Sequence, residues 1–597
     1  MPSQRDAPRT RRSNEFDSPV KLRSLEEQQT HLPVPSQRNT LFRGTRRVYL
    51  GLAFIAITLL ILLNIPNHKG MMRSSLNEQQ PDSNLQDFHN HGSIDETADR
   101  GLFESEGHHT LFVLVNSTMS EISRRMLIRK HLFDNYDNLV PCRRYNTEVH
   151  YKFLVRKEQK ITPELRRQYV AEKIEYDDIV ELPGSRQQDF LEWARSLTTE
   201  SDNTFNFDYL LIMDEHAVVR VDRVLDELKK KIIGGGNFKS TSIDLHNPKL
   251  LVWGGFDNKG NDDKFVVMGM DAISMLLDSK DTIGNQGPNI ITSAYNHFAE
   301  NPDGSPFLFV EDDQRIIPWT NQIGAVQGDE IAVFNAFIDD EFHALMGKMN
   351  IHPVNVCSRV PAQDANSPKK PNIVVLTSSF VYPDNCMLTA ADIAADNKRK
   401  YAKKHGYAFV ARSKEFAEQI FLKRKTVWGK VDAVEKVLVN YDWMLWLDMD
   451  AVIFNPTVTV EGLLEKFKDM TDNLDNKHLI VAKPRGDSMI NAGVFLIRNS
   501  EWSRKYLRAV QEQTTDYFGK FYEQHAMWVV MQQDEWKEGA LLLDGDDHTF
   551  NTFPNRYKPG DFVVHYAPDA CPAKQVIDGV QMADRLEEEG ELANSTS

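Results

Sequence analysis

The chain has 597 residues, of which 41% are apolar and 26% charged; the composition is ordinary for a globular protein, but the length is too great for one hydrophobic core. Its formal net charge of -16 argues against nucleic acid as a general partner. The four cysteines are too few for a disulfide-rich scaffold, and their three alternative pairings stay open. We therefore expect two or more domains and no nucleic-acid partner.

The amino-terminal region predicts a membrane anchor. Residues 1–47 are polar and basic, which is typical of a disordered tail. Residues 48–65 are uncharged and apolar, near the lower length limit for a bilayer-spanning helix. Arginines directly before this run place the tail in the cytosol and the remainder in a lumen. Residues 66–109 lack periodicity and are predicted to be a stem. The sequence thus predicts a single-pass type II membrane protein.

Two rival interpretations of residues 48–65 remain. A cleaved signal peptide is disfavoured by the long basic segment before the run and by the lack of a small-residue cleavage site. A helix of a soluble core is disfavoured by so long a stretch without charge. The sequons at Asn116 and Asn594 agree with a lumenal location, although such triplets are common by chance.

Residues 110–350 alternate between strand-like and helix-like segments, which predicts a mostly parallel sheet with helices on both faces. Strands are predicted at 111–115, 149–155, 178–182 and 207–213, and helices at 122–133 and 190–197. The last of these strands ends at Asp214-Glu215-His216.

This region resembles the β-1,3-galactosyltransferase-like family. The matching pieces are Arg125-x-x-Ile128-Arg129, Asp178-Ile-Val-Glu-Leu182, Tyr209-Leu-Leu-Ile-Met-Asp214 and Glu311-Asp312-Asp313. The resemblance implies Asp214 and His216 as metal ligands, with imidazole in place of the family's third carboxylate. It implies Asp312 as the general base of an inverting transfer. The alternative is a domain that keeps the fold and has lost the activity.

Residues 351–371 are rich in proline and polar residues and are predicted to be a linker. The βα alternation restarts after it, which predicts a second α/β domain over 372–590, followed by a short tail at 591–597. Strands are expected at 372–379, 407–411, 478–482, 490–498 and 561–565, and helices at 390–405, 425–439 and 501–514.

The most informative stretch of this second domain is 441–455, an apolar run that predicts a buried central strand. It ends in Asp448 and Asp450, which an extended chain projects to the same side. Two carboxylates at this spacing can share one divalent cation, which in turn can hold a diphosphate. The alternative is a strand-end turn with two solvated acids.

The order of motifs around this stretch resembles the fungal-type α-1,2-galactosyltransferase and α-1,6-mannosyltransferase family, which includes plant xylosyltransferases. The motifs are Trp428-Gly-Lys430, Trp443-x-x-Trp446-Leu-Asp-Met-Asp-Ala451, Asn491-Ala-Gly-Val-Phe-Leu-Ile-Arg-Asn499, Glu523-Gln524-x-Ala526 and Asp561-Phe-Val-Val-His565. The resemblance implies a GT-A-type, Rossmann-like fold that uses a nucleotide-sugar and Mn²⁺ or another divalent cation, and transfer with retention. The whole chain would then hold two GT-A-like domains in tandem.

The resemblance also implies roles for individual residues. Metal ligands would be Asp448, Asp450 and His565. Substrate-binding residues would be Thr377, Lys430, Asp448, Asn491, Ala492 and Gly493, and catalytic residues Glu523 and Gln524. For Lys430 the alternative is a solvated helix lysine. The tryptophans of these motifs are expected to pack in the core rather than to stack on sugars, because their surroundings are apolar.

We therefore expect a Golgi membrane glycosyltransferase that transfers galactose or mannose from UDP-galactose or GDP-mannose to a glycan acceptor through its second domain. A glycosyltransferase complex is a further expected partner. One alternative is a bifunctional enzyme with an active first domain. Another is a non-catalytic glycan-binding or assembly subunit of a Golgi complex. The intact Asp448, Asp450 and His565 favour catalysis over the last alternative.

Overall fold

The computed structural model describes residues 107–589, apart from residues 157, 159, 183–186, 200–204, 235–242, 257–263, 285–288, 300–303, 360–369, 551 and 568. The predicted tail at 1–47, the apolar run at 48–65, most of the stem and the tail at 591–597 lie outside the described residues. Residues 94–597 form one compact unit. We refer to residues 107–359 as the amino-terminal half and to residues 370–589 as the carboxy-terminal half.

Within the described part of the chain, no helix is both long and apolar enough to cross a membrane. The longest of these helices has 16 residues, whereas a span needs about 20. The prediction of a single-pass type II protein of the Golgi membrane is therefore wrong for the residues that the structure describes. The apolar run 48–65, on which the prediction was based, is not among them.

A seven-stranded sheet organises the described amino-terminal half, in the order β11-β9-β10-β5-β1-β3-β4. Its strands are β1 Gly107–Thr118, β3 Val149–Arg156, β4 Ile179–Leu182, β5 Phe205–Asp214, β9 Leu251–Gly254, β10 Phe265–Gly269 and β11 Leu308–Glu311. The longer helices are α2 Ile122–Leu132, α3 Pro163–Tyr176, α4 Gln187–Thr199, α5 Val221–Lys230, α6 Met270–Asp278, α8 Ile290–Ala299 and α9 Asp339–Lys348. The sheet is mostly parallel, as predicted, because only β10 runs against its neighbours β5 and β9.

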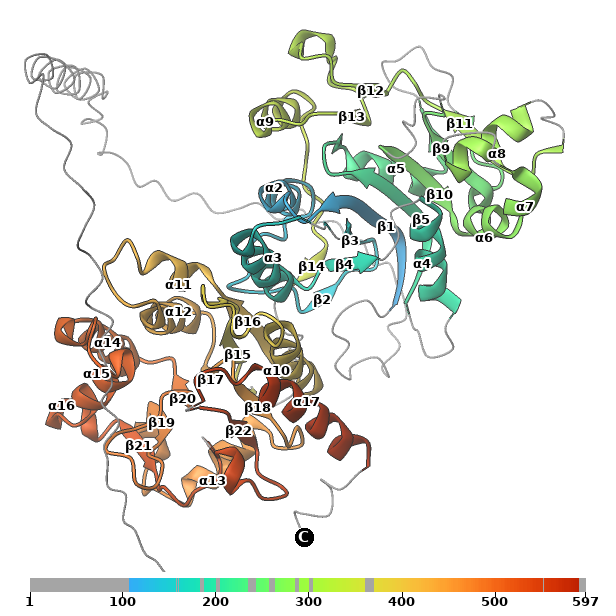
Figure 1. The fold of residues 1–597 in the computed structure, drawn as a ribbon. Helices are drawn as coiled ribbons and strands as arrows, with labels where there is room; N and C mark the ends of the chain where they lie inside the picture. Colours follow the sequence, from blue (N-terminus) through green and yellow to red (C-terminus); the bar gives the residue numbers. More distant parts are fainter. Residues whose placement is uncertain are drawn as a thin grey trace, which may run out of the picture. The chain divides into compact units, whose positions relative to one another are not determined.

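A six-stranded sheet organises the carboxy-terminal half, in the order β16-β15-β17-β20-β19-β21 (Figure 1). Its strands are β15 Ile373–Ser378, β16 Ala408–Arg412, β17 Trp443–Leu447, β19 Leu479–Ala482, β20 Val494–Arg498 and β21 Ala540–Leu543. The helices are α10 Ala391–His405, α11 Lys414–Glu418, α12 Gly429–Leu438, α13 Val460–Lys468, α14 Glu501–Gln511, α15 Tyr522–Met531, α16 Asp534–Lys537 and α17 Ala573–Glu588. Here β20 is the strand that runs against its neighbours β17 and β19.

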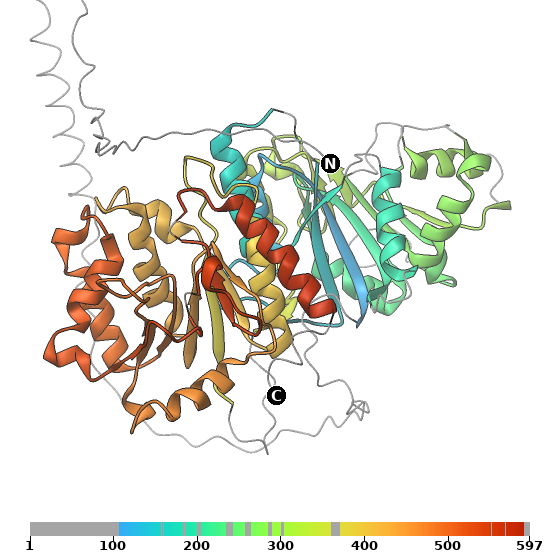
Figure 2. The same cartoon turned by 60° about the horizontal axis from the view of Figure 1, so that its bottom comes forward.

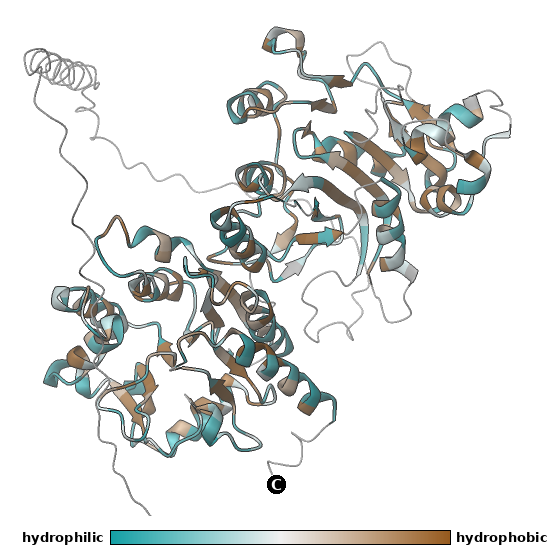
Figure 3. Ribbon diagram, in the orientation of Figure 1, coloured by the Kyte–Doolittle hydropathy of each residue, from teal (hydrophilic) through white to brown (hydrophobic). Residues whose placement is uncertain are grey.

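The apolar run of β17 is buried on both faces of the sheet, as its lack of alternation predicts. Met444 and Trp446 belong to one buried hydrophobic cluster, and Leu445 and Leu447 to the cluster on the opposite side. Figure 3 shows the same pattern, with hydrophobic strands covered by helices that carry hydrophilic residues. The predicted α/β class is therefore confirmed for the described residues.

Two helices that pack against the carboxy-terminal half were not predicted. Helix α17 follows the last predicted strand and contacts α10, and the two lie side by side in Figures 1 and 2. Helix α3 of the amino-terminal half also contacts α10. Helix α3 has a weak amphipathic signal in the sequence, because it buries the polar side chain of Glu172. Helix α17 buries small residues such as Gly579 and Ala583.

Contacts between the two halves are polar as well as apolar. Ile174 on α3 packs against Val381, Ala391, Ala395 and Ala411 of the carboxy-terminal half. The carboxylate of Glu175 accepts hydrogen bonds from Ser379 at 2.7 Å and Ser413 at 2.5 Å. Lys173 and Asp392 form an ion pair at 2.8 Å. The halves thus share one compact unit, and the tandem-domain boundaries stay a prediction.

Candidate functional site

The predicted metal ligands come together because two short strands pair. The central strand β17 ends at Leu447, and the chain turns through Asp448 and Asp450 into β18, Ala451–Ile453. Strand β18 pairs with the antiparallel strand β22, Val563–His565, so that Ala451 lies opposite His565. The backbone N–H of Tyr566 also donates to the carbonyl of Asp450 at 3.1 Å. This ladder fixes the late histidine beside the two aspartates.

Asp448, Asp450 and His565 each offer a ligand atom within 4.8 Å of the others, a spacing at which they could hold one metal ion. His565 is buried, and its Nε2 lies 3.2 Å from a carboxylate oxygen of Asp450. Burial opposes ionisation of Asp450, but the imidazole of His565 outweighs it and lowers the pKa of Asp450. Burial likewise opposes charging of His565, and Asp450 outweighs it and raises the pKa of His565. Each group therefore favours the charged form of the other.

Gly493 is required beneath the imidazole ring. A Cβ at this position would lie 2.1 Å from Cε1 of His565, far inside van der Waals contact. The carbonyl of Gly493 accepts from the backbone N–H of Asp448 at 2.7 Å, and its N–H donates to the Asn491 side chain at 2.8 Å. The glycine predicted to admit a sugar is thus needed first to seat a ligand histidine.

Lys430 is buried and bridges two acids, which rules out the alternative of a solvated helix lysine. Its ammonium group lies 2.9 Å from Asp448 and 3.2 Å from Glu523, and it donates to the carbonyl of Ala492 at 3.1 Å. Burial opposes its charge, but Asp448 and Glu523 raise the pKa of Lys430. Burial raises the pKa of Glu523 even though Lys430 opposes this. The Trp446 indole N–H donates to Asp448 at 2.8 Å.

The remaining predicted residues support the backbone of the site. The side-chain oxygen of Gln524 accepts from the backbone N–H of Ala492 at 2.9 Å. The hydroxyl of Thr377 is buried and donates to the carbonyl of Leu447 at 2.7 Å, at the end of β17. Contact of these side chains with substrate stays a prediction, because the bonds described here are internal to the protein.

A cavity of about 280 Å³ opens beside the predicted metal ligands. Among the predicted residues, Lys430, Asp448, Asp450 and Glu523 line it. We refer to it as the donor pocket, after the sugar donor that the motifs predict. Its lining also includes aromatic residues that sequence reasoning missed, Phe380 and Tyr382, in the loop after β15. Burial raises the pKa of Tyr382, and the nearby carboxylates of Glu523 and Asp448 add to this.

Lys398 is another missed residue. It is fully buried on α10, and its ammonium group donates to the carbonyls of Ala394 at 3.1 Å and Met449 at 3.3 Å. Met449 lies between the two aspartates of the site. Burial lowers the pKa of Lys398 to about 7, although Asp450 and Asp448 act against this. A lysine within the apolar stripe of the predicted helix 390–405 is the signal that would have revealed it.

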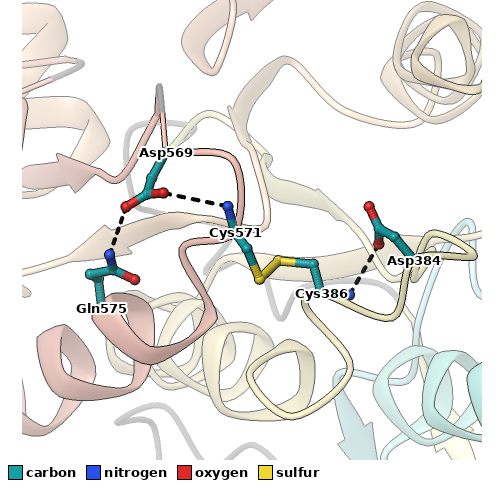
Figure 4. Close-up of a disulfide and its surroundings, with 5 residues drawn as sticks. All are labelled: Asp384, Cys386, Asp569, Cys571 and Gln575. Carbon is teal, nitrogen blue, oxygen red and sulfur yellow. Dashed lines mark hydrogen bonds between the residues drawn. A yellow bond between two sulfur atoms is a disulfide. The ribbon is translucent and has the colours of Figure 1, made fainter. Parts of the chain in front are cut away.

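A disulfide joins the two ends of the donor-pocket wall. Cys386 follows the loop after β15, and Cys571 lies in the segment that leads from β22 to α17 (Figure 4). The side chain of Asp384 accepts from the N–H of Cys386, and that of Asp569 accepts from the N–H of Cys571 (Figure 4). Cys386 and Asp569 line the donor pocket. The pairing that the sequence left open is thereby determined for these two cysteines.

The candidate metal ligands of the amino-terminal half are arranged differently. A carboxylate oxygen of Asp214 lies 3.2 Å from the ammonium group of Lys264, which supplies the positive charge there. Glu215 accepts hydrogen bonds from Ser117 and Thr118, and burial raises its pKa to about 7. Burial lowers the pKa of His216. Among the described residues, no cluster with metal-ligand spacing is found around Asp214 and His216.

Asp312, the predicted general base, is held by a buried ion pair. Its carboxylate accepts from the guanidinium of Arg315 at 2.6 Å and from the indole of Trp253 at 3.1 Å. Arg315 also pairs with Glu227 at 2.7 Å. The oxygens of this carboxylate are already engaged by an arginine and an indole, so this geometry favours a structural role. The catalytic role of Asp312 stays a prediction that the contacts do not support.

Comparison with known proteins bears on the carboxy-terminal half. Residues 369–575 match the model of the galactosyl transferase GMA12/MNN10 family. A probable α-1,6-mannosyltransferase, MNN10 of Saccharomyces cerevisiae, is 29% identical over 29% of this chain and 54% of its own length. An uncharacterised α-1,2-galactosyltransferase of Schizosaccharomyces pombe is 23% identical over 29% of this chain and 62% of its own length. A putative glycosyltransferase of Arabidopsis thaliana is 25% identical over 28% of this chain and 37% of its own length.

These matches confirm the resemblance that the motifs of the carboxy-terminal half predicted, and they confirm this half as a glycosyltransferase sequence. The chain spans between about one third and two thirds of the length of these relatives. The predicted resemblance of the amino-terminal half is not addressed by them.

Proposed function

Because residues 369–575 match the galactosyl transferase GMA12/MNN10 family, we propose that the carboxy-terminal half moves a hexose from a nucleotide-sugar to a glycan acceptor. One observation carries the proposal. Asp448, Asp450 and His565 offer ligand atoms within 4.8 Å of one another, although more than a hundred residues separate the histidine from the aspartates. They meet at the end of a central strand, where ligands of α/β sheets bind.

Asp448, Asp450 and His565 would hold Mn²⁺ or another divalent cation, which would neutralise the charge of the diphosphate leaving group. Two carboxylates and one imidazole suit Mn²⁺ better than Mg²⁺, which prefers oxygen ligands alone. The three predicted metal ligands therefore suit Mn²⁺, the predicted cofactor.

The chain's own residues orient the sugar. Lys430 holds the carboxylate of Glu523 at 3.2 Å, and both line the donor pocket. We propose that Glu523 accepts hydrogen bonds from sugar hydroxyls. It does not act as a nucleophile, because its negative charge is already paired with the ammonium group of Lys430. Transfer would then proceed with retention by front-side substitution. The acceptor oxygen forms the new bond on the face where the phosphate bond breaks, and its proton passes to the leaving phosphate.

The sugar is proposed to be galactose or mannose, carried by UDP-galactose or GDP-mannose. The names of the relatives support these two: a probable mannosyltransferase and an uncharacterised galactosyltransferase. Both donors present the same diphosphate to the metal ligands. The choice between them therefore depends on side chains that contact the sugar.

The test is the variant Asp450→Asn in the full chain. We expect Mn²⁺-dependent transfer and hydrolysis of both nucleotide-sugars to fall at least about 100-fold, because one anionic ligand is lost. Mn²⁺ affinity, measured by titration calorimetry, should fall with them. The control is Asp475→Asn, because the side chain of Asp475 is 95% exposed and remote from the ligands. Full activity of Asp450→Asn would contradict the proposal, and the anomeric configuration of the product, read by NMR, tests retention.

A further inference from the structure

A second cavity, of about 540 Å³, lies between the two halves of the compact unit. We refer to it as the inter-half cavity. The amino-terminal half contributes Tyr136, Gln168 and Tyr176 to its lining, and the carboxy-terminal half contributes Phe380 and Ala417. The function proposed above assigns it no role.

The inter-half cavity adjoins the donor pocket across a wall of one chain segment, the loop after β15. Side chains of this loop alternate between the two cavities, as an extended chain requires. Tyr382 and Asp384 line the donor pocket, and Val381 and Pro383 line the inter-half cavity. Phe380 borders both cavities. Phe380 is therefore the residue at which the two cavities adjoin.

The charges around the inter-half cavity balance. Four acidic and four basic side chains line it. Most of them are paired within the protein: Arg167 with Glu164, and Arg412 and Lys436 with Glu415. A lining without excess charge does not favour a phosphate or another anion. It suits a neutral ligand that has both apolar faces and hydroxyl groups.

Hydrogen bonds between the halves hold side chains that line the inter-half cavity. Glu175 accepts from Ser379 and Ser413, and the side chain of Asn138 donates to the carbonyl of Ala411 at 3.3 Å. Glu175, Ser413 and Asn138 belong to the cavity lining. A preformed cavity loses less conformational entropy when a ligand binds.

We propose that the inter-half cavity binds the inner sugars of a neutral oligosaccharide acceptor whose terminal hydroxyl reaches the donor pocket past Phe380. The proposal rests on the function proposed above for the carboxy-terminal half. The aromatic rings of Tyr136 and Phe380 supply apolar surface for sugar rings, and the side chain of Gln168 supplies a hydrogen-bonding group. The amino-terminal half would thereby contribute acceptor binding to a reaction catalysed by the other half.

The test compares a long and a short acceptor. The full chain is assayed with Mn²⁺, with GDP-mannose or UDP-galactose, and with either methyl α-mannoside or α-1,6-linked mannotetraose. We expect the tetrasaccharide to have a KM about tenfold lower, because only it reaches the inter-half cavity. Ala417→Trp fills the cavity from an exposed position, and Tyr136→Ala removes an aromatic face. Each should raise the KM for mannotetraose about tenfold and leave the KM for methyl α-mannoside and donor hydrolysis unchanged.

The control is Met470→Trp, which adds an indole at another exposed position. Equal KM values for the two acceptors in the wild type, unchanged values for mannotetraose in both variants, or donor hydrolysis without use of either acceptor would overturn the proposal. If the wild type neither hydrolyses nor transfers, the proposed function fails instead. Titration calorimetry of mannotetraose into wild type and Ala417→Trp then decides the inference alone: binding that only the variant loses supports it, and equal or absent binding overturns it.

Discussion

At the scale of single residues, neighbouring charges and burial determine the protonation of the lysines of the site. Lys430 and Lys398 are both helical lysines in the sequence, yet both are buried beside the aspartates of the donor pocket. The pKa of Lys430 is raised because carboxylates outweigh its burial, and that of Lys398 is lowered because burial outweighs them. Lys430 is therefore a permanent charge of the site.

Gly493 offers a direct test of how His565 is seated. Gly493→Ala should place a methyl group inside the imidazole ring and displace it, with a loss of about 1–3 kcal/mol in unfolding free energy. Mn²⁺-dependent transfer should fall more than about tenfold. The matched control is Gly347→Ala on α9, where a Cβ meets nothing within 4 Å and stability should hold or rise. An active, stable Gly493→Ala enzyme would show that His565 is seated otherwise.

Glu215 predicts a dependence of stability on pH. Burial raises its pKa from 4.5 to about 7, so the folded protein binds its proton more tightly than the unfolded chain. The stabilisation is complete below about pH 4.5 and is lost as the pH rises to 7, up to roughly 3 kcal/mol. Urea unfolding should therefore give equal stability for wild type and Glu215→Gln at pH 4.5, and a more stable variant at pH 8. The same difference at both pH values would contradict this.

At the scale of elements, pairing between β18 and β22 creates the site. Neither strand belongs to the six-stranded sheet, and each has only three residues. The disulfide between Cys386 and Cys571 reinforces the same region, because it ties the segment after β22 to the loop after β15. The short strands beside the donor pocket are thus stabilised by their mutual pairing and by a nearby disulfide, and not by a long hydrogen-bonded ladder.

Removal of the disulfide tests this arrangement. Cys386→Ser/Cys571→Ser should lower the unfolding free energy by about 2–4 kcal/mol, since the bond closes a long loop of the unfolded chain. The KM for the nucleotide-sugar should rise, because Cys386 and Asp569 line the donor pocket. Cys142→Ser, in the other half, should leave the KM unchanged. An unaltered KM in the double variant would limit the disulfide to stability.

At the scale of the whole molecule, the two halves behave as one compact unit. Residues on α10 such as Ala391 and Ala395 pack against Ile174 of the other half. A fragment of residues 372–597 would expose this apolar surface and leave Ser379 and Ser413 without Glu175. The carboxy-terminal half therefore depends on the amino-terminal half for stability as well as, under our inference, for acceptor binding.

Calorimetry tests this coupling. The full chain should unfold in one cooperative transition, and the fragment 372–597 should melt at least about 5 °C lower, because it lacks the contacts with α3. The control is the same fragment mixed with the separately expressed amino-terminal half. The mixture should recover part of the lost melting temperature. Two separate transitions in the full chain, one of them at the melting temperature of the fragment, would show that the halves fold independently.

The sequence by itself determined the α/β class, the central strand β17 and the trio Asp448, Asp450 and His565, which the structure brings together. The reason is that apolar runs and strand-end carboxylates are local patterns, and an ordered set of motifs accumulates specificity. Its prediction of a membrane-spanning protein was wrong for the described residues, among which no helix is long and apolar enough to cross a membrane.

Only the tertiary structure decided which partners those residues have. Asp214 meets Lys264, and Gly493 lies under His565, in each case across a stretch of chain whose path the local pattern does not specify. Arg315 lies only three residues from Asp312, yet Glu227 and Trp253, which complete that cluster, come from distant elements. The inter-half cavity is likewise invisible in the sequence, because its two walls belong to segments that are joined only by folding.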